Sequence, residues 1–386
     1  MLNIAKQGWH LPWKGRLVPH ALIDITRQCN VTCRSCYNDG NWESKSLSSI
    51  KNEIETLISL RKLDSVSIIG GEPTLHKDLF AIIEYLTANG LHSELFTNGL
   101  LLDDALAREL KQAGLGCVFL HVQEDQDRPD LDKRNPRQSM KRLLDEKTSL
   151  LKGHGLEVGL SYTFHNDRES ELQWMLDYCL ENASLGYLLV TMDTDVKNMI
   201  PVKGDIFQGM RIVARHVPQR SGDSAPSILN AAERMIVGKD FVPFGYLGSN
   251  MDVLSPRWMS FMVLCAYDAG NLMGQVSLKA SYLEKGYLQI ARLLKGKYPF
   301  YGNQKEKNLK LQLFLNSFLG GRLNRNLRFL GDSLKRKYAI KAKKILLQAP
   351  ACIDDSGKVV HCANCPDAVL KNGKMVPVCI SDKVGV

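Results

Sequence analysis

The chain has 386 residues, of which 44% are hydrophobic and 24% charged, with a net charge of +9. This composition excludes a disordered chain and predicts a catalytic domain with a smaller second module. No run reaches the ~18 apolar residues of a membrane-spanning helix. The first residues do not lead into the apolar run of a signal peptide, so we expect a cytoplasmic protein whose ten cysteines form no disulfide framework.

Strand-like and helix-like patterns alternate between residues 20 and 192. The expected strands are residues 21–26, 65–69, 93–96, 116–122, 156–162 and 185–191, and the expected helices are 47–60, 78–88, 103–113, 139–153 and 169–180. Crossovers of this length predict a parallel sheet. The alternation fits an open doubly wound sheet or a partial barrel, and in both the chemistry gathers at the carboxyl ends of the strands.

Three unusual loops follow the first three expected strands. Cys29, Cys33 and Cys36 come after the first, Gly70-Gly71-Glu72-Pro73 after the second and Thr97-Asn98-Gly99 after the third. Because the carboxyl ends of parallel strands share one rim, we expect the three loops to converge there. Two adjacent glycines let the backbone approach a ligand closely, and Glu72 can accept a hydrogen bond from an ammonium group. An ordinary Asn-Gly turn is the alternative for the third loop.

The C-x3-C-x2-C spacing of Cys29, Cys33 and Cys36 supplies three thiolates, whereas a cubane iron–sulfur cluster has four irons. One iron would then stay free to bind a substrate or cofactor. Zinc is the alternative, but it needs a fourth Cys or His nearby, and the neighbouring histidines in the sequence are His20 and His76.

This motif, together with the Gly-Gly-Glu-Pro loop and the alternation over about residues 20–192, resembles the radical S-adenosylmethionine (radical SAM) superfamily. The resemblance implies a partial (βα)6 barrel and a [4Fe–4S] cluster on Cys29, Cys33 and Cys36. By the same resemblance, the open iron chelates the methionine end of SAM. An electron from a reductant such as flavodoxin or ferredoxin then yields a 5′-deoxyadenosyl radical, which abstracts hydrogen from an unactivated C–H bond.

The resemblance also suggests which residues bind SAM. Members of the family often carry an aromatic residue just before the third cysteine, where this chain has Ser35, and Tyr37 after the cysteine becomes the candidate for adenine contact. The remaining expected cofactor-binding residues are Gly70, Gly71, Glu72, Pro73, Thr97, Asn98, Gln123 and Ser161.

Beyond residue 195 the alternation fades, and residues 225–237, 256–269 and 275–294 are predicted to be helical. Between residues 285 and 345 there are 16 Lys and Arg against Glu306 and Asp332, a net charge of +14. Leucines at 323, 327, 330 and 334 recur at helical spacing among the arginines, which suits a membrane surface or an anionic amphiphile. A core-packing helix with a solvated basic face is the alternative. No nucleic-acid-binding module is visible, so no nucleic-acid partner is expected.

Four further cysteines, Cys352, Cys362, Cys365 and Cys379, lie near the end of the chain with a C-x2-C core. They suit a fully ligated auxiliary [4Fe–4S] cluster or a tetrahedral zinc. C-terminal cysteine extensions occur in the SPASM and twitch groups of radical SAM enzymes, although the spacing here does not match the seven-cysteine SPASM pattern. Cys117, Cys179 and Cys265 stand in apolar surroundings and are expected to be buried hydrophobes.

The sequence therefore predicts three parts: a radical SAM partial barrel (residues 1–192), a helical, basic region facing substrate or membrane (193–345) and a cysteine-rich auxiliary-cluster domain (346–386). The expected function is radical SAM chemistry, as an oxidoreductase or a transferase, on a lipid or other anionic amphiphile. The layout is broadly similar to that of tetraether-lipid-synthase-like members, and the protein could lie at the membrane surface. The alternatives are a peptide-modifying radical SAM enzyme and, in another class, a non-catalytic iron–sulfur electron carrier.

Overall fold

The computed structural model describes residues 8–34, 36, 43–165, 167–193, 228–300, 306–319, 322–353 and 359–381, and the backbone of four two-residue strands between residues 199 and 218. These strands are β8 (Met199–Ile200), β9 (Ile206–Phe207), β10 (Met210–Arg211) and β11 (Val217–Pro218). Tyr37, the candidate for adenine contact, lies outside the described residues.

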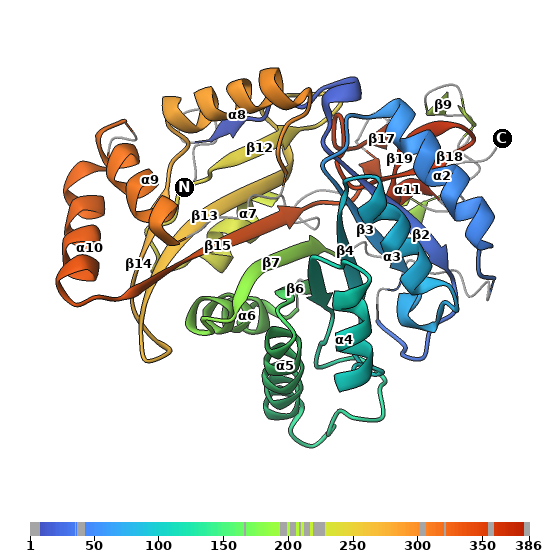
Figure 1. Ribbon diagram of the computed structural model, residues 1–386, viewed down its shortest axis with the longest axis horizontal. Helices are drawn as coiled ribbons and strands as arrows, with labels where there is room; N and C mark the ends of the chain where they lie inside the picture. Colours follow the sequence, from blue (N-terminus) through green and yellow to red (C-terminus); the bar gives the residue numbers. More distant parts are fainter. Residues whose placement is uncertain are drawn as a thin grey trace.

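Six parallel strands in sequential order form the N-terminal half of the main sheet (Figure 1). They are β2 (His20–Thr26), β3 (Ser65–Gly70), β4 (His92–Thr97), β5 (Cys117–Leu120), β6 (Glu157–Phe164) and β7 (Leu185–Met192). The connecting helices are α2 (Leu47–Leu60), α3 (Leu79–Ala88), α4 (Asp104–Gln112), α5 (Pro136–Gly153) and α6 (Glu169–Glu181), with the short η2 (Pro73–Leu75) before α3. The predicted strand–helix order and parallel sheet of a partial barrel are confirmed.

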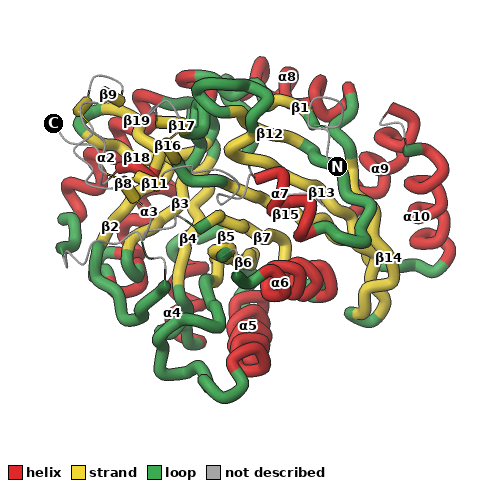
Figure 2. Tube along the Cα trace, turned by 180° about the vertical axis from the view of Figure 1, so that it is seen from behind, coloured by secondary structure: helices red, strands yellow, loops and turns green. Residues whose placement is uncertain are grey.

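The helices pack on one face of this sheet because every second strand residue is apolar and points to them. Ile23 of β2, Ile68 of β3 and Val118 of β5 are fully buried in one large cluster with the helices. Figure 2, seen from behind, shows α5 and α6 next to β6 and β7. The opposite face carries polar and aromatic residues, including His20 and Phe96, and it is the face of the sheet that would be the interior of a barrel.

The sheet continues past β7, and here one prediction was wrong. Residues 256–269 were expected to be helical, but Pro256–Asp268 is a long strand, β13, buried along twelve of its thirteen residues. A strand buried on both faces reads as a continuous apolar run and cannot be told from a buried helix by its pattern. The prediction for 275–294 was partly wrong, because β14 (Asn271–Leu278) occupies its start and α8 (Tyr282–Lys295) only its remainder.

The full order of the main sheet is β1-β12-β13-β15-β7-β6-β5-β4-β3-β2, with β14 paired to β13. The added strands are β1 (Trp9–His10), β12 (Gly245–Gly248) and β15 (Ala339–Gln348), and β15 runs parallel to β7. Their helices are α7 (Ile228–Met235), α8, α9 (Glu306–Leu319) and α10 (Leu323–Lys335). The helices predicted over 225–237 and around Leu323 to Leu334 are confirmed, but the middle region is as much sheet as helix.

The C-terminal segment is made of short elements. They are β16 (Cys352–Ile353), β17 (Val359–Val360), β18 (Ala368–Lys371), β19 (Lys374–Pro377) and α11 (Val378–Ser381), and a single turn η1 (Gly15–Leu17) lies near the start of the chain. Val369 and Val378 pack against Leu22, Ile69 and Phe96 on the polar and aromatic face of β2–β4. The segment therefore covers the open side of the sheet beside the expected site.

Candidate functional site

The cysteine loop leaves β2 at the rim predicted for it. Cys29 and Cys33 are half-buried and Cys36 is exposed. Burial is the main cause that raises the pKa of the Cys29 thiol, and the nearby Cys33 and Cys36 thiols add to it. Thr32 forms a two-way backbone bridge with Asp127, which follows β5. The three thiols thus lie close enough to influence one another, on a loop that spans the rim.

The Gly70–Gly71 pair holds this loop by close backbone contact. The Gly71 N–H donates to the Thr26 carbonyl at 2.7 Å, and the Glu72 N–H donates to the Gln28 carbonyl at 2.7 Å. A Cβ on Gly71 would overlap the Gln28 carbonyl oxygen and lie 2.7 Å from the carbon of the same carbonyl. A Cβ on Gly70 would overlap the Thr26 carbonyl oxygen. Because the two glycines have no side chain, the loop after β3 can approach the base of the cysteine loop. The sequence had suggested only that the glycines allow close approach of a ligand.

Glu72 is fully buried at the centre of the rim. Its Oε1 accepts hydrogen bonds from the Thr74 N–H at 3.0 Å, the Thr74 hydroxyl at 2.6 Å and the Thr97 hydroxyl at 2.7 Å. Its Oε2 accepts from the Asn98 N–H at 2.7 Å. A carboxylate has about four lone-pair positions shared by two oxygens, so the Oε2 atom keeps one further position for an ammonium donor. Pro73 begins η2 directly after it, where no N–H is needed.

Asn98 connects the loop after β4 to the cysteine loop. Its side-chain amide donates to the Asn30 side-chain oxygen at 2.8 Å, and its own backbone is bonded to Glu72. Asn98 is 6% exposed, so this contact is shielded from water. The structure thus brings together Glu72, Thr97 and Asn98 with the cysteine loop, as the shared rim of parallel strands requires.

Two residues that the sequence reasoning did not select complete this network. The Gln126 amide donates to Cys33 Sγ at 3.4 Å, and Gln126 Oε1 accepts from Arg128 Nη1 at 3.1 Å. Arg128 Nη1 also donates to the Asn98 carbonyl at 2.9 Å, and its Nη2 pairs with Asp130 at 2.9 Å. Both residues follow β5, so the strand-end rule that selected Gln123 could have found them.

Gln123 and Ser161 have structural partners in the protein. The Gln123 side chain pairs with the backbone of Thr163, donating at 3.0 Å and accepting at 2.9 Å, and it thereby links the ends of β5 and β6. The Ser161 carbonyl lies 3.0 Å from His121 Nδ1. At the same rim His165 Nδ1 lies 2.7 Å from an Asp193 carboxylate oxygen, and its Nε2 lies 3.6 Å from Asp125. His165 is thus held between two carboxylates.

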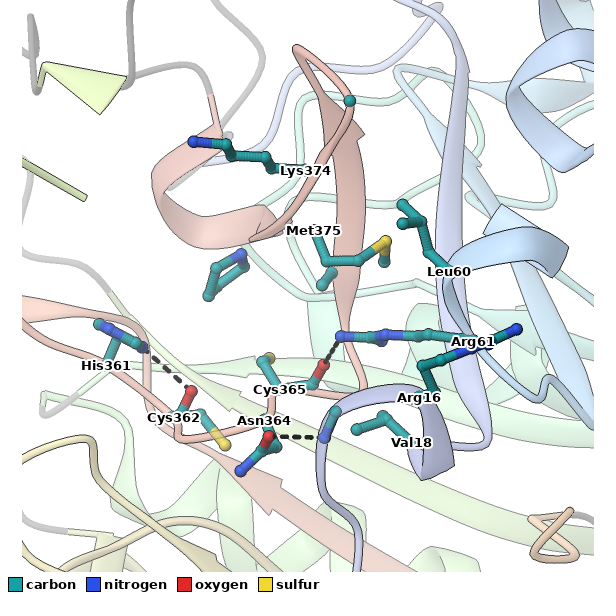
Figure 3. A pocket seen from close by; sticks show the side chains of 14 residues that line it. Arg16, Val18, Leu60, Arg61, His361, Cys362, Asn364, Cys365, Lys374 and Met375 are labelled. Atoms are coloured by element: carbon teal, nitrogen blue, oxygen red, sulfur yellow. Dashed lines mark hydrogen bonds between the residues drawn. The ribbon is translucent and has the colours of Figure 1, made fainter. Parts of the chain in front are cut away.

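Two of the late cysteines, Cys362 and Cys365, interact directly. The Cys379 sulfur accepts from the Ala351 N–H at 3.3 Å, beside Cys352, whereas Cys365 interacts with Cys362, whose thiol is the main cause that raises the pKa of Cys365. Cys362 and Cys365 line a cavity of about 380 Å³ (Figure 3). Arg61 enters it from the end of α2 and donates to the Cys365 carbonyl at 2.9 Å and to the His20 carbonyl at 2.6 Å. Burial lowers the pKa of Arg61 to about 10.

The donor chemistry of both cysteine sets fits iron–sulfur clusters, since thiolates are the ligands that such clusters use. In the part of the chain that the structure describes, no three His, Cys, Asp or Glu side chains lie close enough to hold a metal ion. Ligation by Cys29, Cys33 and Cys36, and by Cys352, Cys362, Cys365 and Cys379, stays a prediction. None of the described helices is long and apolar enough to span a bilayer.

The N-terminal part of the chain, which carries the rim residues, is similar to known proteins. Residues 23–179 match the model of the radical SAM superfamily. The chain is 28% identical over 170 residues to the Fe-coproporphyrin III synthase of Methanosarcina barkeri, covering 41% of this chain and 40% of that protein. It is 35% identical over 111 residues to a probable GTP 3′,8-cyclase of Pyrococcus abyssi, covering 28% of this chain and 36% of that protein.

A structural comparison finds Streptococcus suis SuiB bound to S-adenosylmethionine, at 17% identity with a TM-score of 0.37, covering 46% of this chain and 41% of SuiB. The chain spans only about two fifths of the length of the curated relatives it matches. The match to the radical SAM superfamily thus covers residues 23–179, and over this part the chain is similar to members of that superfamily.

Proposed function

We propose that the protein is a radical SAM enzyme whose [4Fe–4S] cluster is held by Cys29, Cys33 and Cys36. The observation that carries this proposal is the hydrogen-bonded network from Glu72 through Asn98, Arg128 and Gln126 to Cys33. An electron carrier has no need of a buried Gly-Gly-Glu loop tied to its cysteine loop. When bound, the cluster and SAM together supply a one-electron bond cleavage that ends in hydrogen abstraction from substrate.

The chain's own residues position and shield these groups. The free lone-pair position on Glu72 Oε2 would accept from the ammonium of SAM's methionine, a charge-assisted bond to a fully buried carboxylate. Phe96 and Phe119 stack at 4.6 Å on the inward face of the sheet and form an apolar floor below the rim. The packing of Val369 and Val378 over this face excludes water from the same side.

For the substrate we propose a lipid or other anionic amphiphile. Of the 16 Lys and Arg between residues 285 and 345, eleven lie in α8, α9, α10 and β15, and β15 is hydrogen-bonded to β7. A concentration of cations attached to the barrel favours an anionic partner. An enzyme that acts on a peptide would cleave SAM in the same way. The two hypotheses differ in the molecule, lipid or peptide, that loses a hydrogen atom to the 5′-deoxyadenosyl radical.

For the auxiliary centre we propose a second [4Fe–4S] cluster on Cys352, Cys362, Cys365 and Cys379, with zinc as the alternative. All four cysteines belong to the segment that packs on the open side of the sheet. About eight irons per chain after anaerobic reconstitution would support two cubanes. About four irons with one zinc would assign zinc to the late cysteines.

The test is anaerobic reconstitution followed by incubation with SAM and dithionite. We expect 5′-deoxyadenosine from the wild type and none from Cys33→Ala. Cys265→Ala is the matched control, because Cys265 is buried in the core of β13, and it should retain the activity. A wild type that holds iron but makes no 5′-deoxyadenosine would refute the enzyme and favour the electron carrier. With perdeuterated anionic lipid or perdeuterated peptide, deuterium in 5′-deoxyadenosine identifies the substrate class.

A further inference from the structure

Helix α8 turns its apolar side to solvent. Tyr282, Leu293 and Leu294 are 79%, 73% and 82% exposed, and the other exposed apolar side chains of the helix are Leu283, Tyr287 and Ile290. Residues 283, 287, 290 and 294 recur at intervals of four, three and four, so they form one stripe along the helix. We call these six side chains the α8 stripe. A surface helix of a globular protein normally buries such a stripe.

The orientation of α8 is fixed by polar contacts on its other side. Ser281 and Glu284 form a capping box at its start, and the buried Glu284 also accepts from the Asn316 amide of α9 at 2.9 Å. Leu288 packs into the aromatic cluster over β12 and β13, and Ala291 is buried. Rotating the helix to bury the stripe would break these bonds, so the exposure belongs to the fold. Figure 1 shows α8 along the edge of the molecule above β12.

Cations flank the stripe but do not interrupt it. On a helical wheel the six side chains and Gly286 fill one continuous arc without a charged residue, and Lys285 and Lys295 lie beyond its two edges. The Lys285 ammonium lies 5.5 Å from the Tyr282 ring centroid, and the exposed Lys295 ends the helix. The neighbouring α9 exposes a second apolar group of Leu311, Phe314, Leu315 and Phe318. A charge-free apolar arc with basic flanks is typical of a helix that lies in a membrane interface.

We infer that the α8 stripe docks the protein on the surface of an anionic bilayer. Charge decides between the possible occupants. A second copy seated on the stripe would bring the basic side chains of two α8 helices together, Lys285, Arg292 and Lys295 in each, whereas anionic headgroups would neutralise them. Tyr282 and Tyr287 suit the headgroup region, and Lys285 and Lys295 can extend to lipid phosphates. The inference deepens the proposed lipid substrate, on which it rests for its role in catalysis.

The test is flotation of the full chain with vesicles of phosphatidylcholine alone or with 30% phosphatidylglycerol, at low and high salt. We expect binding to the anionic vesicles that weakens at high salt, and at least ~10-fold weaker binding by Ile290→Glu/Leu294→Glu, since two apolar side chains leave the interface. Ile290→Gln/Leu294→Gln should also bind more weakly, which separates lost apolar contact from added charge. The control is Val237→Glu, an exposed apolar residue after α7 on the opposite face of the sheet.

Equal binding by the wild type and Ile290→Glu/Leu294→Glu would overturn the inference. So would a wild type that binds no anionic vesicle, or a concentration-dependent dimer that this variant makes monomeric, which would assign the stripe to a second copy. Flotation needs neither cluster nor SAM. Failure to bind with normal formation of 5′-deoxyadenosine therefore refutes the docking alone, and binding without 5′-deoxyadenosine refutes the enzyme alone.

Discussion

Replacement of Gly71 by alanine should disrupt the cysteine loop while leaving the rest of the sheet folded. The new Cβ would overlap the Gln28 carbonyl oxygen and lie 2.7 Å and 2.8 Å from the Gln28 carbon and the Arg27 oxygen. Carbon contacts are optimal at ~3.5 Å, so the loop must move by about 0.7 Å or more. All three neighbours are backbone atoms, so no side chain can rotate away to relieve the contact.

The displacement would stretch two buried backbone hydrogen bonds, Gly71 N–H to Thr26 and Glu72 N–H to Gln28, each 2.7 Å long. With ~1–3 kcal/mol for each buried group left unsatisfied, we expect the free energy of unfolding to fall by about 2–4 kcal/mol. Because the same bonds anchor the cysteine loop, iron content after reconstitution and formation of 5′-deoxyadenosine should fall at least ~10-fold, the effect of ~1.4 kcal/mol.

The assays are urea unfolding followed by circular dichroism, iron analysis and product chromatography. Gly153→Ala is the matched control, since Gly153 ends α5 with open space around its Cα, and alanine there should stabilise by ~0.5–1 kcal/mol. If Gly71→Ala unfolds within ~0.5 kcal/mol of the wild type and binds the same iron, the close approach does not hold the loop and the reasoning fails.

Two further predictions concern buried charge. Arg128→Met removes a guanidinium that is 1% exposed and donates hydrogen bonds to Asn98, Gln126 and Asp130, so it should lower the free energy of unfolding by ~3–5 kcal/mol and reduce iron retention. The control Lys141→Met breaks an exposed ion pair and should change stability by less than ~0.5 kcal/mol. Equal effects of the two substitutions would contradict a structural role of the Arg128 network. Burial, aided by Arg61, lowers the pKa of His20 to about 3. Between about pH 6.5 and 3 only the unfolded state binds a proton at His20, so the free energy of unfolding decreases by up to ~1.4 kcal/mol for each unit by which the pH is lowered. Urea unfolding at pH 7, 6 and 5 should show this slope in the wild type and not in His20→Gln. Parallel slopes would refute this second prediction.

Much of the N-terminal half could be predicted because its signals are local. The β2–β7 strands alternate with helices whose apolar faces recur at helical spacing, and the boundaries of α2 agree with the prediction at both ends. The convergence of the cysteine, Gly-Gly-Glu and Thr-Asn loops follows from the shared rim of a parallel sheet. Gln126 and Arg128 were missed because a buried Arg becomes significant only when its acceptors, such as the Asn98 carbonyl, are known.

The amino-acid sequence alone indicated the resemblance to the radical SAM superfamily, the order of the six parallel strands and the three thiols at their rim, since each depends on spacing within a short stretch of chain. Only the tertiary structure decided that residues 256–268 form a strand, because an apolar run buried on both sides has no period to read. It also decided that the glycine pair packs against the cysteine loop and that the α8 stripe points outward. These features depend on which distant segments meet, and a helix's pattern shows that it has an apolar side without showing whether that side meets the core or the solvent.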